Sequence, residues 1–280
     1  MASPLRNVSD TARWAAVYRA DETDRRAALF RDPFARKLAG ARGEEIRRLF
    51  RRRDRVAWPW VTRTVLFDRA ITRLVSGGVD LVINLAAGLD ARPYRMTLPP
   101  ALRWIEVDLP GIIDYKTEVL AADRPMCRLE RVKADLADHA VRRDLVARLG
   151  AMGKDALVLT EGLLIYLSPD DVRSFSADVA VVPPCRHWLL DMVSPGLLSR
   201  LQRGIGRQLG EAGAPLKFGP DEGPAFFTAQ GWRAADVQSL VKNAARIGRL
   251  PLAMRPISWL PESPRPGRRP WGGVVLLERG

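Results

Sequence analysis

Cysteine and histidine are scarce in this chain of 280 residues. Its two cysteines, Cys127 and Cys185, have no metal-binding spacing, which argues against a disulfide framework and a cysteine-based metal centre. We expect both to be buried free thiols. The two histidines, His139 and His187, are too few for a histidine-based metal centre. The sequence therefore predicts a protein without a bound metal.

Long apolar runs are absent as well, which excludes a membrane-spanning helix. The first residues, 1–6, lack the apolar core of a secretion signal. Hydrophobic residues make up 47% and charged residues 28% of the chain, as in an ordinary globular protein. We therefore expect a cytoplasmic protein with no membrane partner.

Lysine is also rare, with only six among 45 basic residues, yet the formal net charge is +13. Such a charge can indicate binding to nucleic acid. Here the arginines are scattered and interleaved with acids, as in residues 21–26. We interpret the charge as a compositional preference for arginine and predict no nucleic-acid partner. The densest run, Arg51–Arg55, is interpreted as a solvated helix face.

Two patterns follow one another along the chain. Up to residue 76 the apolar spacing is helical, and beyond residue 77 short apolar strands alternate with helices. Helices are predicted at 9–29, 44–53, 61–76, 112–122, 139–149 and 236–248, with a helix start at Ser168, and strands at 81–85, 102–107, 129–132, 156–160, 188–193 and 273–277. The alternation predicts an α/β fold whose parallel sheet is covered on both faces. We expect a helical N-terminal extension (1–76), a cofactor-binding domain (77–280) and, within it, a lid insertion at about 195–225.

The stretch from Val79 to Arg92 carries the strongest local signal. Its apolar strand runs directly into Ala86, Ala87 and Gly88, a turn of small residues. Small residues let a ligand approach the backbone closely, because no bulky side chain stands in the way. We interpret this turn as part of a site for a nucleoside cofactor.

Carboxylates follow the next three strands. In an open parallel sheet, ligands bind beyond the carboxyl ends of the strands, so these residues should line one site. Asp108 stands 20 residues after Gly88, where a carboxylate can accept hydrogen bonds from ribose hydroxyls. Asp135 could accept from an adenine amino group while Leu136 covers the ring, and Glu161 could face a cationic amino group.

Several segments, in the right order, resemble the leucine carboxyl methyltransferase family. They are Asn84-Leu85-Ala86-Ala87-Gly88-Leu89-Asp90-Ala91-Arg92, Ile105-Glu106-Val107-Asp108-Leu109-Pro110 and Thr160-Glu161-Gly162-Leu163-Leu164-Ile165-Tyr166-Leu167, preceded by Thr11-Ala12, Arg19-Ala20-Asp21-Glu22 and Asp32-Pro33-Phe34-Ala35. The family includes tetracenomycin-type polyketide carboxyl O-methyltransferases. The resemblance covers about residues 9–170. It implies a class I S-adenosylmethionine-dependent, Rossmann-like fold, mostly parallel with an antiparallel final strand.

The resemblance also implies roles for single positions. Arg63 would pair with the carboxylate of the methionine moiety, and Glu161 would bind its amino group. The remaining cofactor contacts would come from Ala86 and Gly88 beneath that moiety, Asp108 at the ribose, and Asp135 and Leu136 at the adenine. The cofactor would be S-adenosyl-L-methionine, the product S-adenosyl-L-homocysteine, and no metal would take part.

The sequence departs from the family at two positions. Ala86 stands where the family usually has glycine, and Ala91 where it usually has threonine. A methyl group at Ala86 would crowd the cofactor or demand ordinary backbone angles.

The acceptor is expected to be a small acid. Methyl transfer from a sulfonium is an in-line displacement, to which positioning contributes roughly 7–11 kcal/mol. A carboxylate nucleophile needs no general base, whereas a phenol benefits from one. His187 falls at the wrong end of its strand and His139 starts a helix, so no base is obvious, although Tyr166, the catalytic candidate, or an acid could serve. We therefore expect O-methylation of a carboxylate, or of a hydroxyl, on a natural-product or polyketide acceptor.

Two other functions stay open at this point. A nicotinamide-dependent oxidoreductase would use the turn at 86–91 for a dinucleotide and Asp108 for its ribose, but would leave Arg63 and Glu161 without a task. A non-methylating cyclase or binding protein on the same fold is favoured only by Ala86.

Overall fold

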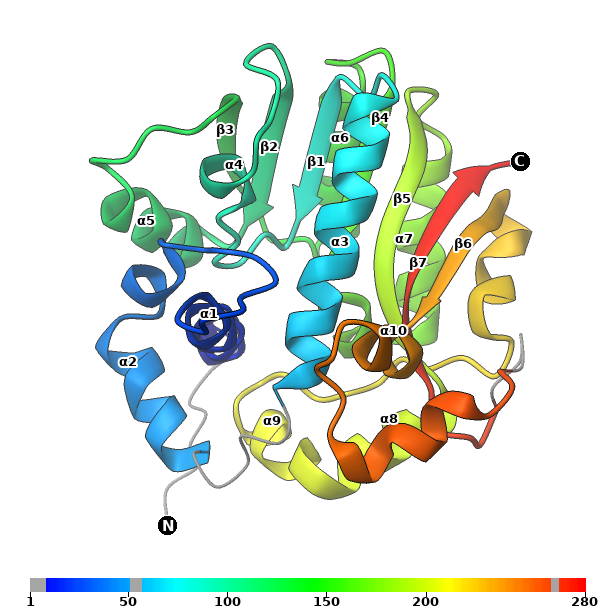
Figure 1. The fold of residues 1–280 in the computed structure, drawn as a ribbon. Coiled ribbons are helices and arrows are strands. Elements are labelled where there is room, and N and C mark those ends of the chain that lie inside the picture. Colours follow the sequence, from blue (N-terminus) through cyan, green and yellow to red (C-terminus); the bar gives the residue numbers. More distant parts are fainter. Residues whose placement is uncertain (1–8, 51–56, 263–266) are drawn as a thin grey trace.

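A computed structural model describes residues 9–50, 57–262 and 267–280. Its centre is one seven-stranded sheet in the order β3-β2-β1-β4-β5-β7-β6 (Figure 1). The strands are β1 (Leu81–Leu85), β2 (Arg103–Asp108), β3 (Arg128–Lys133), β4 (Ala156–Thr160), β5 (Cys185–Val193), β6 (Trp232–Ser239) and β7 (Gly272–Arg279). The first five strands pair in parallel, and β7 runs antiparallel to β5 and β6. This confirms the predicted fold class, including the antiparallel final strand.

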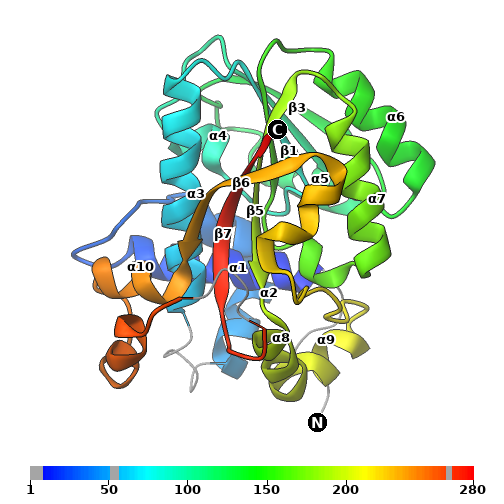
Figure 2. The ribbon, with the colours of Figure 1, turned by 90° about the vertical axis from the view of Figure 1, so that its right-hand side faces the viewer.

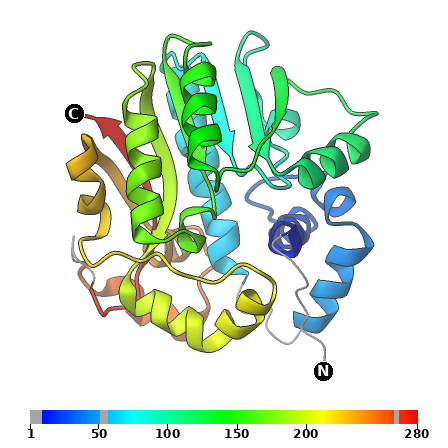
Figure 3. The same ribbon diagram turned by 180° about the vertical axis from the view of Figure 1, so that it is seen from behind.

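Helices cover both faces of the sheet (Figures 1 and 3). They are α1 (Ser9–Thr23), α2 (Ala35–Phe50), α3 (Trp58–Ser76), α4 (Arg92–Arg95), α5 (Pro110–Val119), α6 (His139–Gly150), α7 (Pro169–Ala180), α8 (Pro195–Leu201), α9 (Arg207–Glu211) and α10 (Leu240–Arg246), with short turns η2 (Leu164–Tyr166), η3 (Gln202–Gly206), η4 (Gly223–Gln230) and η5 (Leu252–Trp259). In β1, Leu81, Ile83 and Leu85 pack with α6 and α7, whereas Val82 packs with α3. Because both faces are buried, β1 and β4 read as continuous apolar runs, and their predicted bounds match the structure.

The first helix is shorter than predicted. It ends at Thr23 instead of residue 29. Side chains at its end bind the chain that folds back: the Thr23 hydroxyl accepts a hydrogen bond from the backbone of Asp32, and Glu22 accepts one from the backbone of Leu29. These local bonds compete with further helical turns. Similarly, α10 begins at Leu240 and not at 236, because Ser239 caps it and the preceding residues pair with β7.

Helix α1 lies across the carboxyl edge of the sheet, where Figure 1 shows it end-on beyond β1 and β2. Ala12 of α1 faces Gly88 of the turn after β1, and Arg19 donates a hydrogen bond to the carbonyl oxygen of Leu89. The N-terminal helices therefore contact the segment that the sequence singled out.

The segment at 195–225 folds as α8, η3 and α9 followed by extended chain, at the end of the molecule towards which β5 runs (Figure 2). It packs on α1, α2 and α3 through an apolar cluster that we call the edge cluster. Its buried members are Trp14, Tyr18, Ile46, Leu198, Leu209, Ala212 and Leu216, with Trp60, Ile165, Tyr166 and Val193 packed against them. Its role as a lid, and the division of the chain at residue 76, stay predictions.

Three further expectations concern composition. Cys127 and Cys185 are buried free thiols, as predicted, and burial raises the pKa of each to about 12. Among the described residues, no helix is both long and apolar enough to cross a bilayer. The arginine run at 51–55, and the predicted helix beyond residue 50, lie outside the described residues.

Candidate functional site

The turn after β1 combines two residues with unusual backbone angles. Gly88 has a φ of 51°, and Ala86 has a φ of 57°, the one positive value at a non-glycine residue in the described chain. A Cβ atom on Gly88 would lie 3.4 Å from the Cβ of Ala12, so α1 closes over the turn at contact distance. The small residues therefore serve both the turn and the close approach of α1.

The backbone at Ala86 corrects one expectation. Ordinary backbone angles are wrong for this alanine, because Ala86 adopts the left-handed conformation that glycine accepts without cost; crowding of the cofactor by its methyl group stays a prediction. Such a conformation costs alanine roughly 1–2 kcal/mol. The alanine therefore keeps the shape of the turn and carries the strain.

Asp108 joins the end of β2 to this turn. One carboxylate oxygen accepts a hydrogen bond from the backbone N–H of Gly88 at 2.6 Å, and the other accepts from Leu109 at 2.7 Å. Burial raises the pKa of Asp108, although these two donors oppose the rise. Gly88 and Asp108 lie side by side, as the sequence predicted.

Arg63 and Glu161 also meet, although 98 residues separate them in the chain. Arg63 lies in the second turn of α3, and Glu161 directly follows β4. The Nε atom of Arg63 donates to Oε1 of Glu161 at 2.9 Å, and its Nη1 atom donates to Asp191 of β5, also at 2.9 Å. The guanidinium group also lies 4.8 Å from the ring centre of Trp60.

The Arg63–Glu161 pair belongs to a chain of buried charges along the sheet edge. The other oxygen of Glu161 accepts from Nη1 of Arg92 at 2.7 Å, and Arg92 also binds Asp90 and Asp68. The ion pairs link Asp191, Arg63, Glu161, Arg92, Asp68, Arg95, Asp32 and Arg19 in that order, and Asp90 pairs with Arg92 as a side branch. Every charge in it has a partner of opposite sign, as burial requires.

Burial and pairing act in opposite directions on these groups. Burial alone would raise the pKa of Glu161, but Arg92 and Arg63 outweigh it and hold that pKa below its usual value. Burial would lower the pKa of Arg63, but Asp191 and Glu161 outweigh it. At neutral pH the edge therefore presents a fixed cation beside a fixed anion.

Asp135 and Leu136 lie further out along the edge. Asp135 is exposed and accepts a hydrogen bond from the backbone of Ala137 at 2.9 Å. Leu136 is partly buried against the core on the α6–α7 face. The backbone N–H of Ala134 donates to the carbonyl oxygen of Asp108, which links this segment to the end of β2. No side-chain hydrogen bond joins Asp135 to Gly88 or Glu161 among the described residues.

Tyr166 lies in η2, where it contacts the edge cluster. Its hydroxyl shares a hydrogen bond with Thr11 of α1. Burial raises the pKa of Tyr166, and the nearby Arg63 only partly opposes the rise. At neutral pH the hydroxyl is therefore protonated and can donate a hydrogen bond; a catalytic role for Tyr166 stays a prediction.

Within the described residues, neither histidine bonds to Arg63, Asp108 or Glu161. His187 is near the amino end of β5, close to Asp155 and Glu278, and His139 begins α6 beside Asp171. Within the described residues, no group of three or more His, Cys, Asp and Glu side chains could hold a metal ion.

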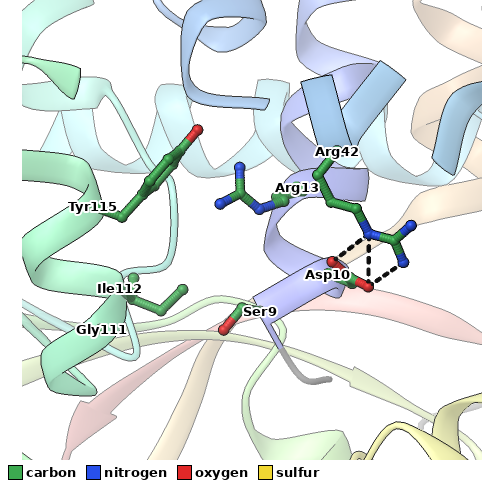
Figure 4. A pocket seen from close by; sticks show the side chains of 7 residues that line it. All are labelled: Ser9, Asp10, Arg13, Arg42, Gly111, Ile112 and Tyr115. Atoms are coloured by element: carbon green, nitrogen blue, oxygen red, sulfur yellow. Dashed lines mark hydrogen bonds and ion pairs between the residues drawn. The ribbon is translucent and has the colours of Figure 1, made fainter. Parts of the chain in front are cut away.

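A cavity of about 350 Å³ opens between α1, α2 and α5 (Figure 4). Helix α5 begins shortly after Asp108 in the chain. It is lined by Ser9, Asp10, Arg13, Arg42, Gly111, Ile112 and Tyr115. Its charges are engaged within the protein: Arg42 binds Asp10, and Arg13 stacks on the Tyr115 ring at 4.0 Å and donates to a backbone carbonyl. Helix α1 therefore lines this cavity with one side and covers the turn at Gly88 with another.

A model of the leucine carboxyl methyltransferase family matches residues 12–180. The chain belongs to this family. A Streptomyces avermitilis relative, assigned as an S-adenosyl-L-methionine-dependent methyltransferase, is 34% identical over 96% of this chain and 95% of its own. A Streptomyces coelicolor relative with the same assignment is 33% identical over 90% of each chain. The resemblance inferred from the sequence is thus confirmed.

Solved structures agree on the fold. A Thermobifida fusca protein assigned as a methyltransferase aligns with a TM-score of 0.61 at 18% identity, over 99% of this chain and 96% of its own. A DUF574 family protein of Streptomyces avermitilis gives 0.60 at 13% identity, over 96% and 97%. At such identities the likeness concerns the class I methyltransferase fold alone.

The sequence alone did not single out several residues of the ion-pair chain at the sheet edge, chiefly Asp191, Arg92, Asp90 and Asp68. Asp191 had an available signal, because a charged residue near the carboxyl end of an apolar strand is the pattern that singled out Asp108. Arg92 and Asp90 stand within the turn that the sequence emphasised. Asp68 lies on α3 and had no signal of its own, because only the fold brings that helix to the edge.

Relief of backbone strain at Ala86 gives a first prediction. Ala86→Gly should raise the free energy of unfolding by up to about 1 kcal/mol, because the strain it removes exceeds the roughly 0.4–1 kcal/mol that glycine's extra freedom in the unfolded chain costs. Urea denaturation measures the change. The control is Ala177→Gly in the interior of α7, which should destabilise because glycine is a poor helix former. Destabilisation by Ala86→Gly as large as in the control would contradict the account.

The buried charges predict how stability depends on acid. Asp68 accepts from Arg92 at 2.7 Å and from Arg95 at 2.7 and 2.8 Å. Burial favours a higher pKa, but the two arginines outweigh it and hold the pKa of Asp68 below its ordinary 3.8. A lowered carboxyl pKa contributes stability that is present above about pH 4 and is lost as the pH falls through the folded-state value.

Asp68→Asn should therefore lower the free energy of unfolding at pH 7 by about 3–5 kcal/mol, since it leaves buried arginines short of a partner. The gap to the wild type should narrow at pH 3. Urea denaturation at both pH values measures this gap. The control is Asp144→Asn, which replaces a side chain that is 80% exposed and should change the free energy of unfolding little. A gap of equal size at pH 3 would show that the charge of Asp68 does not matter.

Proposed function

We propose that the protein is an S-adenosylmethionine-dependent O-methyltransferase that methylates the carboxylate of a small, largely apolar natural-product acid. Membership of the leucine carboxyl methyltransferase family supports the cofactor and the reaction class. The observation that carries the proposal is the meeting of Arg63 and Glu161 beside Gly88 and Asp108 at one sheet edge.

The donor set of this edge fits the cofactor. Arg63 offers a guanidinium fork to a carboxylate, and Glu161 offers an anion to an ammonium group. Asp108 has two acceptor oxygens for ribose hydroxyls. Gly88 has no side chain, and a Cβ there would already touch Ala12. Asp135 and Leu136 are proposed to meet the adenine ring, at the outer part of the same edge.

S-adenosylmethionine supplies a methyl group bound to a sulfonium, which is already activated for transfer. The chain's own task is to align the acceptor with that methyl group and to keep water away. The edge cluster suits this task, because α1, α3 and the 195–225 segment form an apolar boundary next to Arg63 and Tyr166. An acceptor with an apolar or aromatic body would fit such a boundary.

The described surroundings of Tyr166 support a carboxylate acceptor. Tyr166, the catalytic candidate from the sequence, has a raised pKa and is protonated at neutral pH, His187 lies beside Asp155, and His139 is bonded to Asp171. A carboxylate is already ionised and needs no proton acceptor, whereas a phenol must lose its proton. The protonated Tyr166 hydroxyl is suited to donating a hydrogen bond to such a group.

The proposal is tested by incubation with methyl-labelled S-adenosylmethionine and a panel of aromatic and aliphatic acids and matched phenols. We expect label on the carboxylates, released by mild alkali because a methyl ester hydrolyses and an ether does not. Label confined to the phenols would refute the acceptor assignment. A thermal shift with S-adenosylhomocysteine but none with NAD is expected, and the reverse would favour an oxidoreductase.

Tyr166→Phe separates the two acceptor types within the same protein. General-base catalysis contributes about 10²- to 10⁴-fold, so loss of a base would remove nearly all activity. We expect a loss of kcat below about 10-fold, measured from pH 6 to pH 9. A larger loss with a changed pH profile would make Tyr166 the base.

A further inference from the structure

Asp191 holds the two sides of the charged edge together. Its Oδ2 atom accepts from Nη1 of Arg63 at 2.9 Å, and its Oδ1 atom accepts from the backbone N–H of Gly162 at 2.5 Å. Gly162 directly follows Glu161 in the chain. One partly buried carboxylate therefore binds both the arginine and the peptide that carries its acidic partner.

Two further residues, Gly162 and Trp60, enclose the guanidinium group of Arg63. Gly162 has a φ of 69°, and a Cβ there would lie 3.2 Å from Nη1 of Arg63, so the guanidinium group rests directly on the glycine backbone. Trp60 lies over the guanidinium at 4.8 Å. Since only Glu161 and Asp191 pair with Arg63 among the described residues, these two carboxylates set the direction of its guanidinium group.

Glu161 and Asp191 differ in what else they bind. Both oxygens of Glu161 serve arginines, Arg63 and Arg92, whereas Asp191 binds Arg63 and a backbone amide. In the structure Arg63 and Glu161 face each other, which is the arrangement that a zwitterionic ligand would replace. Such a ligand offers a carboxylate to Arg63 and an ammonium group to Glu161 in exchange for one internal ion pair.

We propose that Asp191 is a positioning residue that keeps Arg63 directed into the site while the Arg63–Glu161 pair opens for the amino-acid end of the cofactor. This rests on the roles proposed for Arg63 and Glu161. With Asp191 in place, Arg63 keeps one anionic partner throughout the exchange. Without it, Glu161 alone directs Arg63, and once that pair opens the ligand's carboxylate is the one anion left to hold the cation in place.

The proposal predicts a selective effect on binding. S-adenosylhomocysteine carries the amino-acid end, whereas 5′-methylthioadenosine has the same nucleoside and lacks that end. Asp191→Asn should raise the Kd of S-adenosylhomocysteine about 10-fold or more, the usual scale of one hydrogen bond to a charged group. It should change the Kd of 5′-methylthioadenosine by less than about 3-fold. Isothermal titration at pH 7.5 measures both, and a general structural loss would weaken the two ligands alike.

A matched control breaks a similar pair on the other face of the sheet. Asp178 binds Arg142 at 2.7 Å, and its side chain is 13% exposed against 17% for Asp191. Asp178→Asn should lower the melting temperature without changing the ratio of the two affinities. If Asp191→Asn does not fold, Asp191→Glu is used, because it keeps the charge on a longer side chain. It should weaken the binding of S-adenosylhomocysteine but not that of 5′-methylthioadenosine.

The outcomes are distinguishable. If the wild type binds neither ligand at millimolar concentration, the proposed function itself fails. If Arg63→Gln leaves the preference for S-adenosylhomocysteine intact, the role given to Arg63 is wrong. If Arg63→Gln abolishes that preference while the Asp191 variants keep it, or weaken both ligands equally, the role of Asp191 is overturned.

Discussion

The ion pair between Arg63 and Glu161 is the constraint on which the rest of the site depends. Two charges buried at a sheet edge need partners, because the interior of a protein cannot hold an unpaired ion. Their partners pair with further charged residues, and the chain of ion pairs ends at Arg19 on α1. Helices α1, α3 and α4, the turn after β1 and strands β4 and β5 are thereby held in one arrangement.

Helix α1 acts on the same edge in two ways. It ends the chain of ion pairs through Arg19, and it closes the turn through the contact of Ala12 with Gly88. Thr11, one residue earlier, shares a hydrogen bond with Tyr166. Under the proposed function, a helix placed in this way would help to keep water from the edge, which suits a transfer reaction in which water would compete as a nucleophile.

Much of this could be predicted from the sequence, and the remainder could not for identifiable reasons. Apolar runs located β1 and β4, and the residues that follow strands gave Asp108 and Glu161. The fold alone brings Glu161 and Asp68 to Arg92, and Arg63 to Asp191, so no local pattern reveals these pairs. The left-handed angle of Ala86 contradicts what alanine ordinarily prefers, and only the strained turn imposes it.

The central claim is that this edge binds the amino-acid end of S-adenosylmethionine between Arg63 and Glu161. A crystal structure with S-adenosylhomocysteine bound tests it most directly. The account predicts that the ligand's ammonium group lies within hydrogen-bond distance of Glu161, its carboxylate on Arg63, and its ribose hydroxyls on Asp108. A ligand whose amino-acid end lies elsewhere, with the Arg63–Glu161 pair still closed, would contradict it.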